Sequence, residues 1–429
     1  MAIVSNHYLK KENYYNMISV NKIPKYRFNE FLDEWVGVRI SEVVTFSKGK
    51  GISKSDILKN GKIKCIRYGE LYTIYDQIIN IVESSTDINS ELVYSKGNEV
   101  LIPSSGETAI DIATASCINL EGIALGGDLN ILTSKQNGNF LAYLISGKSK
   151  LNIARKAQGI SVIHLYSKHI GEVNINLPSL PEQQKIADFL STVDKKIQSL
   201  KRKKELLESY KKGVMQKIFP AKGRQEPEIR FKKDDGSDYK EWEESTLGMI
   251  SNNVMYGIGS SATKFDGVNK YIRITDIDEA TNTFKPSPLT SPSGEIEPKY
   301  YLKKGDIVFA RTGASVGKTY LYNQSDGKLV FAGFLIKIAV NNAHDSRFVF
   351  YQTQTYHYKK WVVVYSVRSG QPGINAEEYK KFKIKLPSKE EQTKIANFLT
   401  AIDDKINVVN TQIEKMEEWK KGLLQQMFV

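Results

Sequence analysis

The chain is poor in the residues from which disulfide frameworks and metal sites are built. Its 429 residues include only two cysteines, Cys65 and Cys117, which is too few for a disulfide framework or a four-cysteine zinc site. Both are most simply small core residues. The five histidines are scattered, and no pair has the H-E-x-x-H spacing that places two ligands on one helical face. We therefore expect the chain itself to bind no metal.

Long apolar runs are also missing. No run of ~18 apolar residues occurs, so a membrane-spanning helix is not expected. The opening MAIVSNHYLKKEN lacks the apolar core of a secretion signal. These absences favour a cytoplasmic protein without a membrane partner.

Motifs for catalysis are absent or incomplete. No Asn-Pro-Pro or Asp-Pro-Pro loop for base methylation occurs, and the lone glycine pair of Gly126 and Gly127 is explained by a turn. The segment ARTGASVGKT resembles a phosphate-binding loop, but Gly313 stands only four residues before Gly317, one too few, and no following helix is evident. The sequence therefore predicts that the chain alone is not an enzyme and binds no cofactor.

Positive charge, in contrast, is abundant. The chain carries 61 Lys and Arg against 48 Asp and Glu, a formal net charge of +13. A polyanion is the natural partner, because neutralising phosphates releases counterions. An acidic membrane surface is the competing interpretation, and it would require an amphipathic basic helix or an apolar span.

An internal repeat organises the sequence. LPSLPEQQKIADFLSTVDKKI begins at Leu177 and LPSKEEQTKIANFLTAIDDKI at Leu386, an offset of 209 (386 minus 177) that is kept without a gap to Phe219 and Phe428. About 20 of roughly 43 paired positions are identical, which indicates duplication.

Each copy predicts a long helix with a coiled-coil seam, because apolar residues alternate at steps of four and three. Pro181 and Pro387 stand near the helix starts, where Glu182 and Glu390 suit the helix dipole, and Pro220 ends the first helix. The seam positions are Ile186, Leu190, Val193, Ile197, Leu200, Lys204, Leu207, Lys211, Val214 and Ile218, then Ile395, Leu399, Ile402, Ile406, Val409, Ile413, Met416, Lys420, Leu423 and Met427.

About 37 helical residues make a rod on the order of 55 Å long, too long to lie inside one small domain. The first copy is mainly basic and the second slightly acidic, so we expect the two helices to pair with each other. The alternative is two unrelated surface helices, each packed on its own domain.

Before each helix lies a region of roughly 150 residues with strand-like alternation and Gly, Asn and Asp turns, typical of a mixed α/β domain. Landmarks recur between the two regions: PKYRF with PEIRF, KCIRYGEL with KYIRITDI, and YSKGNEVLI with LKKGDIVFA. A shared framework with different residues filling it suggests one scaffold that presents two different binding surfaces.

Basic and hydrogen-bonding residues gather near predicted loops, where a scaffold displays recognition groups. Lysines would mostly contact phosphates, whereas Arg and Gln can distinguish guanine and adenine edges. The DNA-binding candidates of the first region are Lys48, Lys50, Lys54, Arg67, Ser104, Ser105, Arg155, Lys156 and Gln158, together with Lys148 and Lys150. Those of the second region are Tyr256, Arg273, Arg311, Thr312, Ser315, Lys318, Tyr356, Arg368 and Gln371, together with Lys264, Lys359 and Lys360. For any single residue, a plain solvated surface is the alternative.

At this point the sequence resembles the specificity (S) subunits of type I restriction-modification systems over nearly its whole length. The resemblance rests on the LPxxxEQxKIAxFL…DxxI block at Leu177–Ile197 and Leu386–Ile406, the two RF…EW openings, KGDIVFARTGASVGK and IHLYSKHIGEVNINLP. It implies an α+β protein with a pseudo-two-fold internal repeat. Two mixed α/β target recognition domains, each reading half of an interrupted DNA site, would be joined by two long helices that form an antiparallel coiled coil.

The resemblance also implies partners: double-stranded DNA, two modification (methyltransferase) subunits docked on the helices, and two restriction (endonuclease and translocase) subunits. S-adenosylmethionine, ATP and Mg are then expected on those partners. The domains would be residues 1–176, with a flexible arm at 1–23, and 221–385, with helical spacers at 177–220 and 386–429. Roles cannot be copied between halves, since VLIPSSGETAI stands where the second half has IVFARTGASVG. A free-standing DNA-binding regulator and a single-chain enzyme with diverged motifs are the alternative functions.

Overall fold

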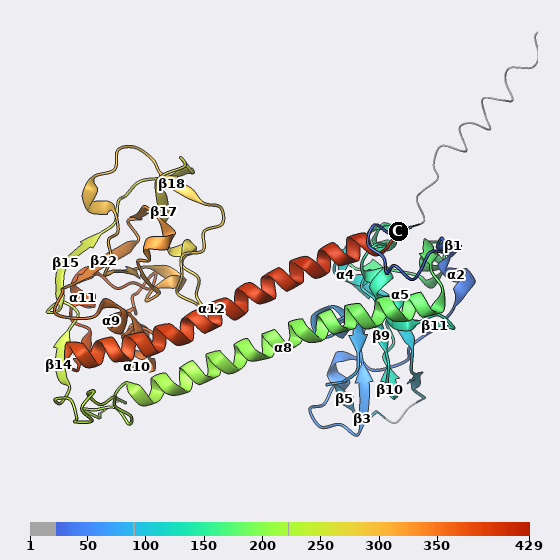
Figure 1. Cartoon of the computed structure of the whole chain (residues 1–429), viewed down its shortest axis with the longest axis horizontal. Coiled ribbons are helices and arrows are strands. Elements are labelled where there is room, and N and C mark those ends of the chain that lie inside the picture. Colours follow the sequence, from blue (N-terminus) through green and yellow to red (C-terminus); the bar gives the residue numbers. More distant parts are fainter. Residues whose placement is uncertain (1–22, 89–90, 222) are drawn as a thin grey trace, which may run out of the picture. The chain divides into compact units, whose positions relative to one another are not determined.

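The computed structural model describes residues 23–88, 91–221 and 223–429, so the predicted arm lies, apart from Ile23, outside the described residues. The chain forms two compact units (Figure 1). The first unit comprises the residues up to Lys201 together with Thr411–Val429, and the second comprises Arg202–Asn410. Each of the two long helices therefore contributes residues to both units.

The first unit is built around mixed sheets. Its strands are β1 (Val36–Arg39), β2 (Val44–Lys48), β3 (Ile63–Ile66), β4 (Ile78–Ile79), β5 (Ser85–Thr86), β6 (Val93–Lys96), β7 (Glu99–Pro103), β8 (Ser105–Gly106), β9 (Ser116–Ile118), β10 (Glu121–Leu125), β11 (Leu129–Ser134), β12 (Ile163–His164) and β13 (Asn174–Leu177). The larger sheets have the orders β2-β11-β7-β9-β4 and β5-β3-β10-β6, while β1 pairs with β13 and β8 with β12.

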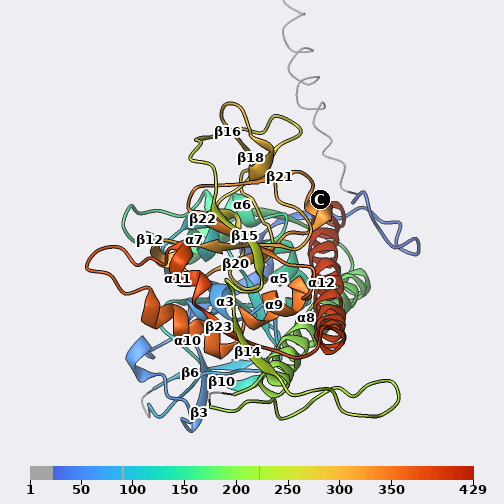
Figure 2. The same ribbon diagram turned by 90° about the vertical axis from the view of Figure 1, so that its left-hand side faces the viewer.

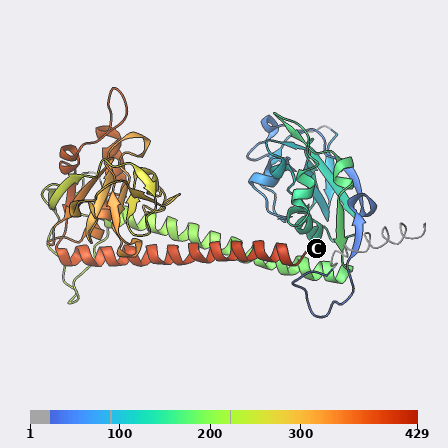
Figure 3. The ribbon, with the colours of Figure 1, turned by 90° about the horizontal axis from the view of Figure 1, so that it is seen from above.

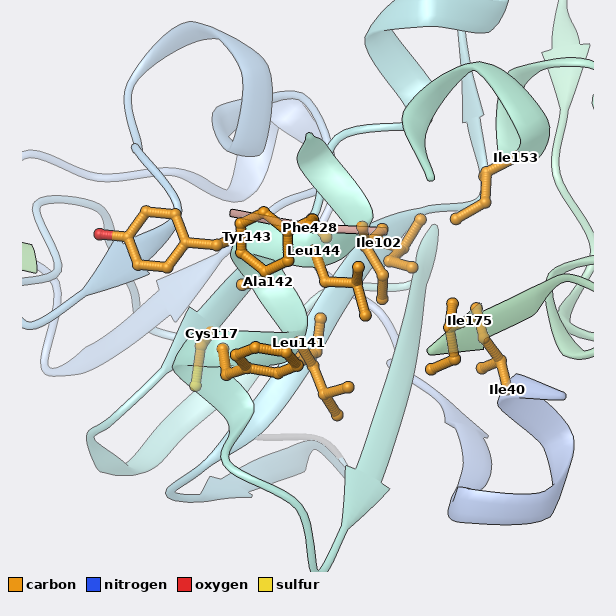
Figure 4. Close-up of a cluster of buried hydrophobic side chains, with 14 of the residues drawn as sticks. Ile40, Ile102, Cys117, Leu141, Ala142, Tyr143, Leu144, Ile153, Ile175 and Phe428 are labelled. Carbon is orange, nitrogen blue, oxygen red and sulfur yellow. The ribbon is translucent and has the colours of Figure 1, made fainter. Parts of the chain in front are cut away.

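Short helices complete the first unit. They are α2 (Ile40–Val43), α3 (Glu70–Thr73), α4 (Ala109–Ile112), α5 (Gly138–Ser146), α6 (Lys150–Ala154) and α7 (Ser167–Gly171), with a 3-10 turn η1 (Lys54–Asp56). The apolar helix α5 is almost wholly buried and lies in the centre of the main core (Figure 4). Both cysteines are free and buried, which confirms their assignment to the core.

The second unit, which faces the viewer in Figure 2, also combines sheets with short helices. Its strands are β14 (Glu243–Thr246), β15 (Ser251–Tyr256), β16 (Ala262–Lys264), β17 (Lys270–Ile272), β18 (Thr290–Pro292), β19 (Asp306–Ala310), β20 (Thr319–Leu321), β21 (Leu329–Phe331), β22 (Leu335–Val340) and β23 (Lys383–Leu386). The main sheet has the order β15-β22-β19-β20, and β14–β23, β16–β18 and β17–β21 form pairs. The helices are α9 (Ser346–Gln352), α10 (Tyr356–Tyr365) and α11 (Ala376–Lys380), with 3-10 turns η2 (Ile274–Asp276), η3 (Pro298–Tyr300), η4 (Gly313–Ser315) and η5 (Gln324–Asp326).

The two repeated segments form α8 (Leu180–Ile218) and α12 (Lys389–Gln426), as predicted from their periodicity (Figure 3). The predicted seam residues are buried from Ile186 to Leu200 on α8 and from Ile395 to Ile413 on α12, while Leu207 is half-buried. In the first unit the start of α8 shares one core with Leu423 and Met427 of α12. In the second unit Ile218 of α8 shares one core with the start of α12. The helices therefore pack together within each unit.

Lysines that interrupt the predicted seam are held by polar partners on the other helix. Lys420 Nζ lies 2.6 Å from Asp194, and Lys211 Nζ lies 2.7 Å from Asp403. Lys204 Nζ donates to Asn410 Oδ1 at 2.7 Å. In the second unit these pairs run in opposite directions along the two helices, so the pairing there is antiparallel. The seam tolerates these lysines because each ammonium group has a partner.

The RF…W landmark of each domain anchors the start of the helix that follows it. Arg27 donates from Nε and Nη2 to the buried carboxylate of Glu182, at 2.8 Å each. Arg230 makes the equivalent pair with buried Glu391, at 3.2 and 2.8 Å. Because a two-bond guanidinium–carboxylate contact fixes geometry as well as charge, it sets where each helix begins.

An aromatic residue just beyond the end of each long helix inserts its ring into a domain core. Phe428 packs on Trp35 and Phe140 in the first unit, with ring centroids 6.3 and 5.5 Å away. Phe219 packs on Phe348 in the second unit at 5.5 Å. The duplication seen in the sequence is therefore also a duplication of tertiary contacts.

Candidate nucleic-acid interface

Four predicted residues of the second unit meet where β19 ends. The guanidinium of Arg311 lies 4.9 Å from the ring centroid of Tyr256, a cation–π distance. Thr312 forms a β-bridge with Gly373, which places the loop of Gln371 beside it. Gly313 has φ +71°, a backbone conformation that favours glycine, and Gln371 Nε2 lies within 2.8 Å of the place a Cβ would take. Arg311, Thr312 and Gln371 thus form a polar cluster, with the ring of Tyr256 packed against the Arg311 guanidinium.

The segment that resembled a phosphate-binding loop is a hairpin-like turn. It runs from the end of β19 through η4, which contains Ser315, to β20, so a strand and not a helix follows. Lys318 lies on the same turn, where its carbonyl accepts from Ala310 N, but its Nζ is 3.1 Å from Glu279. The turn presents hydrogen-bonding groups without the geometry of an ATP site.

Other candidates of the second unit lie outside this cluster, and two of their arginines are paired with carboxylates. Arg273 is clamped by Asp276, and Arg368 donates twice to Glu378 at 2.6 Å. Tyr356, with Lys359 and Lys360, lines a groove of about 1790 Å³. Lys264 lies exposed on β16.

In the first unit, Lys48 and Lys54 are exposed, and Lys50 pairs with Glu91 at 2.5 Å. Ser104 and Ser105 are buried, not displayed on a loop, because Ser105 belongs to β8 and pairs with His164. Lys148 is exposed, whereas Lys150 is half-buried and donates to Thr114. The outward groups of this set are thus Lys48, Lys50, Lys54 and Lys148.

Arg155, Lys156 and Gln158 come together around a pocket of about 320 Å³. Its wall also contains Lys168, His169 and Glu172, which the sequence reasoning did not single out. Lys156 pairs with Glu172 at 2.8 Å. The only sequence signal was the basic SKH of IHLYSKHIG, whose position beside residues 155–158 depends on the fold.

Throughout residues 23–88, 91–221 and 223–429, no group of three or more His, Cys, Asp or Glu is placed to hold a metal ion. None of the helices in these ranges is both long and apolar enough to cross a membrane.

A family model described as the type I restriction modification DNA specificity domain matches residues 32–209 and 239–418. Two relatives from Methanocaldococcus jannaschii are 26% identical to the chain. The type I restriction enzyme MjaVIII specificity subunit aligns over 99% of this chain and 96% of its own length. The putative MjaX specificity subunit aligns over 91% and 86%.

Solved structures share the fold. A type I restriction-modification S subunit from M. genitalium is 16% identical, with a TM-score of 0.63 over 95% of this chain and 99% of that one. A chain from work on complex assembly and conformational transition of the type I R-M system is 15% identical, with a TM-score of 0.51 over 92% and 98%. Because the family model covers both halves, the chain belongs to the type I restriction modification DNA specificity domain family and is a non-catalytic DNA specificity subunit.

Proposed function

We propose that each unit contains a target recognition domain that reads one half of a bipartite DNA site. The observation that supports this most is that Ser104 and Arg311 make the same kind of backbone contact at corresponding places in the two units but have different side chains. Ser104 N donates to Asp128 O at 2.9 Å, and Arg311 N donates to Phe334 O at 3.1 Å. Equivalent backbone with different side chains is what two readers of different sequences require.

The recognition domains we propose are residues 1–176, with a flexible arm at 1–23, and 221–385. Within them, the lysines position phosphates, and the cluster of Arg311, Thr312 and Gln371 contacts base edges. The first domain would use the surface formed by Lys48, Lys50 and Lys54, together with the pocket of Arg155.

The helical spacers, 177–220 and 386–429, would set the gap between the half-sites and bind two modification subunits. Large apolar side chains exposed on them support docking, namely Leu206 and Tyr210 on α8 and Val408 and Trp419 on α12. The modification subunits would supply S-adenosylmethionine chemistry, and two restriction subunits would supply ATP- and Mg-dependent steps in the cytoplasm.

The deciding experiment is to co-express the chain with its modification subunit and to map methylated adenines by single-molecule sequencing. Methylation at one bipartite motif that disappears without the chain is the expected result. A stable, active complex without any motif would instead favour a free-standing regulator. Methylation by the chain alone would overturn the non-catalytic role.

A further inference from the structure

Arg67 and Arg273 occupy the same place in the repeated framework. Arg67 follows β3 and Arg273 follows β17, and each strand pairs in parallel, with Ile66 opposite Leu125 and Ile272 opposite Phe331. The backbone N–H of each arginine donates to a carboxylate three residues later, Glu70 at 2.6 Å and Asp276 at 2.9 Å. The two arginine side chains nevertheless differ, because only one of them is bound by that carboxylate.

Asp276 holds the Arg273 side chain. It accepts from Arg273 Nε and Nη2, at 2.8 Å each, and its carboxylate is only 2% exposed. A guanidinium whose Nε–Nη2 edge is committed to a buried carboxylate cannot offer that edge to a base. Arg273 therefore fixes η2 in the second unit.

Glu70 does not hold the Arg67 side chain. One oxygen of Glu70 accepts from the backbone of Arg67 and the other accepts from Ser84 Oγ. Arg67 Nε is buried without a partner, and its guanidinium only approaches the Tyr68 ring, at 5.9 Å. Within the described part of the chain this guanidinium makes no hydrogen bond or ion pair. A guanidinium without a protein partner leaves donors available to an acceptor on a bound molecule.

In the second unit the uncommitted arginine stands at another framework position. The backbone N–H of Arg311 makes a contact equivalent to that of Ser104, but the Ser104 side chain is buried and too short to reach the surface. The Arg311 guanidinium rests on Tyr256, with no hydrogen-bond or ion-pair partner among the described residues, and Phe334 is exposed beside it. Of these repeated framework positions, one in each unit thus carries an arginine without a side-chain hydrogen bond or ion pair, and the two positions are not equivalent.

We propose that Arg67 reads a guanine in one half-site and Arg311 reads a guanine in the other, while Arg273 is a positioning residue that reads no base. Arginine recognises guanine by donating two parallel hydrogen bonds to N7 and O6, and each such pair discriminates against other bases on the order of ten- to hundredfold. The inference rests on the proposed function of two half-site readers.

The test compares variants of the full chain in complex with the modification subunit, using methylated-adenine maps. Arg67→Ala should extend methylation to sites in which one guanine of one half-site is replaced, with discrimination lowered on the order of ten- to hundredfold. Arg311→Ala should do the same in the other half-site. Arg273→Ala should lower methylation at all sites and leave the motif unchanged, because loss of framework order does not alter base preference.

Arg224→Ala, which removes an exposed arginine between α8 and β14, is the charge-matched control and should leave both rate and motif unchanged. If an alanine variant fails to assemble, Arg67→Lys and Arg311→Lys keep the charge but lose the paired geometry, and the same relaxation is expected. An unchanged motif in the Arg67 or Arg311 variants, relaxation in the same half-site by both, or relaxation by Arg273→Ala would overturn the inference. If the unmodified chain directs no bipartite motif, the proposed function itself fails.

Discussion

The ammonium group of Lys420 lies 2.6 Å from Asp194, and Asp194 also accepts from the hydroxyl of Tyr143 at 2.7 Å. Lys211 and Asp403 repeat this contact in the second unit, where Tyr351 donates to Asp403 at 2.8 Å. Each repeat-related triad joins both helices to a domain. The polar positions of the seam are therefore structural contacts between the helices.

We expect Lys420→Met to lower the free energy of unfolding by about 1–3 kcal/mol, since it leaves the half-buried Asp194 without its cation. The double variant Lys420→Met with Asp194→Asn should recover most of the loss, because no unpaired charge remains. Thermal unfolding of the three proteins measures this. Equal loss in the single and double variants would contradict the assignment.

Leu190→Ala should destabilise the first unit by about 2–5 kcal/mol, because Leu190 on α8 is fully buried in the core that the helix shares with the domain. Leu206→Ala is the matched control, since Leu206 lies on the same helix with 55% of its surface exposed. Urea unfolding curves should separate the two variants. Similar midpoints would show that the start of α8 does not depend on this core.

Acidification should destabilise the second unit through His344 and His357. Burial lowers the pKa of both imidazoles from 6.5. The unfolded chain then binds more protons than the folded one, so their contribution is fully present above pH 6.5 and declines as pH falls below it. In the double variant His344→Gln with His357→Gln, the unfolding midpoint should change less with pH in that range. In the control variant His164→Gln, at an exposed site, the pH dependence of the midpoint should stay the same.

The two thiols should resist alkylation in the folded chain. Burial raises the pKa of Cys65 to about 11 and that of Cys117 to about 12, so almost no thiolate forms at neutral pH. Mass spectrometry after iodoacetamide should find neither residue modified until denaturant is added. Rapid labelling of native Cys117 would argue against its place in the core.

Matched insertions of seven residues after Lys204 and after Asn410, which face each other, should widen the gap between half-sites by roughly 3 base pairs. The half-sites themselves should not change, because no recognition residue is touched. Methylated-adenine maps report both quantities. An unchanged gap would refute the idea that the helices act as a ruler.

The sequence predicted the repeat, the two long helices, their buried seams and two mixed α/β domains. These features follow from local periodicity, which is readable wherever one face of a helix is buried. The role of Lys420 could not be predicted, because its partner Asp194 lies far away in the chain and only folding brings the two together. The same holds for Lys168 and His169, which join the pocket of Arg155.

Residue type alone determined that arginines and lysines would be candidates for binding DNA, since only charge and donor geometry are written in the sequence. Tertiary structure decided which of them are uncommitted. Arg273 and Arg67 have the same local pattern, yet Asp276 holds one side chain and Glu70 turns away from the other toward Ser84. That choice depends on where a carboxylate oxygen lies relative to a guanidinium, and only the packed chain fixes such a distance.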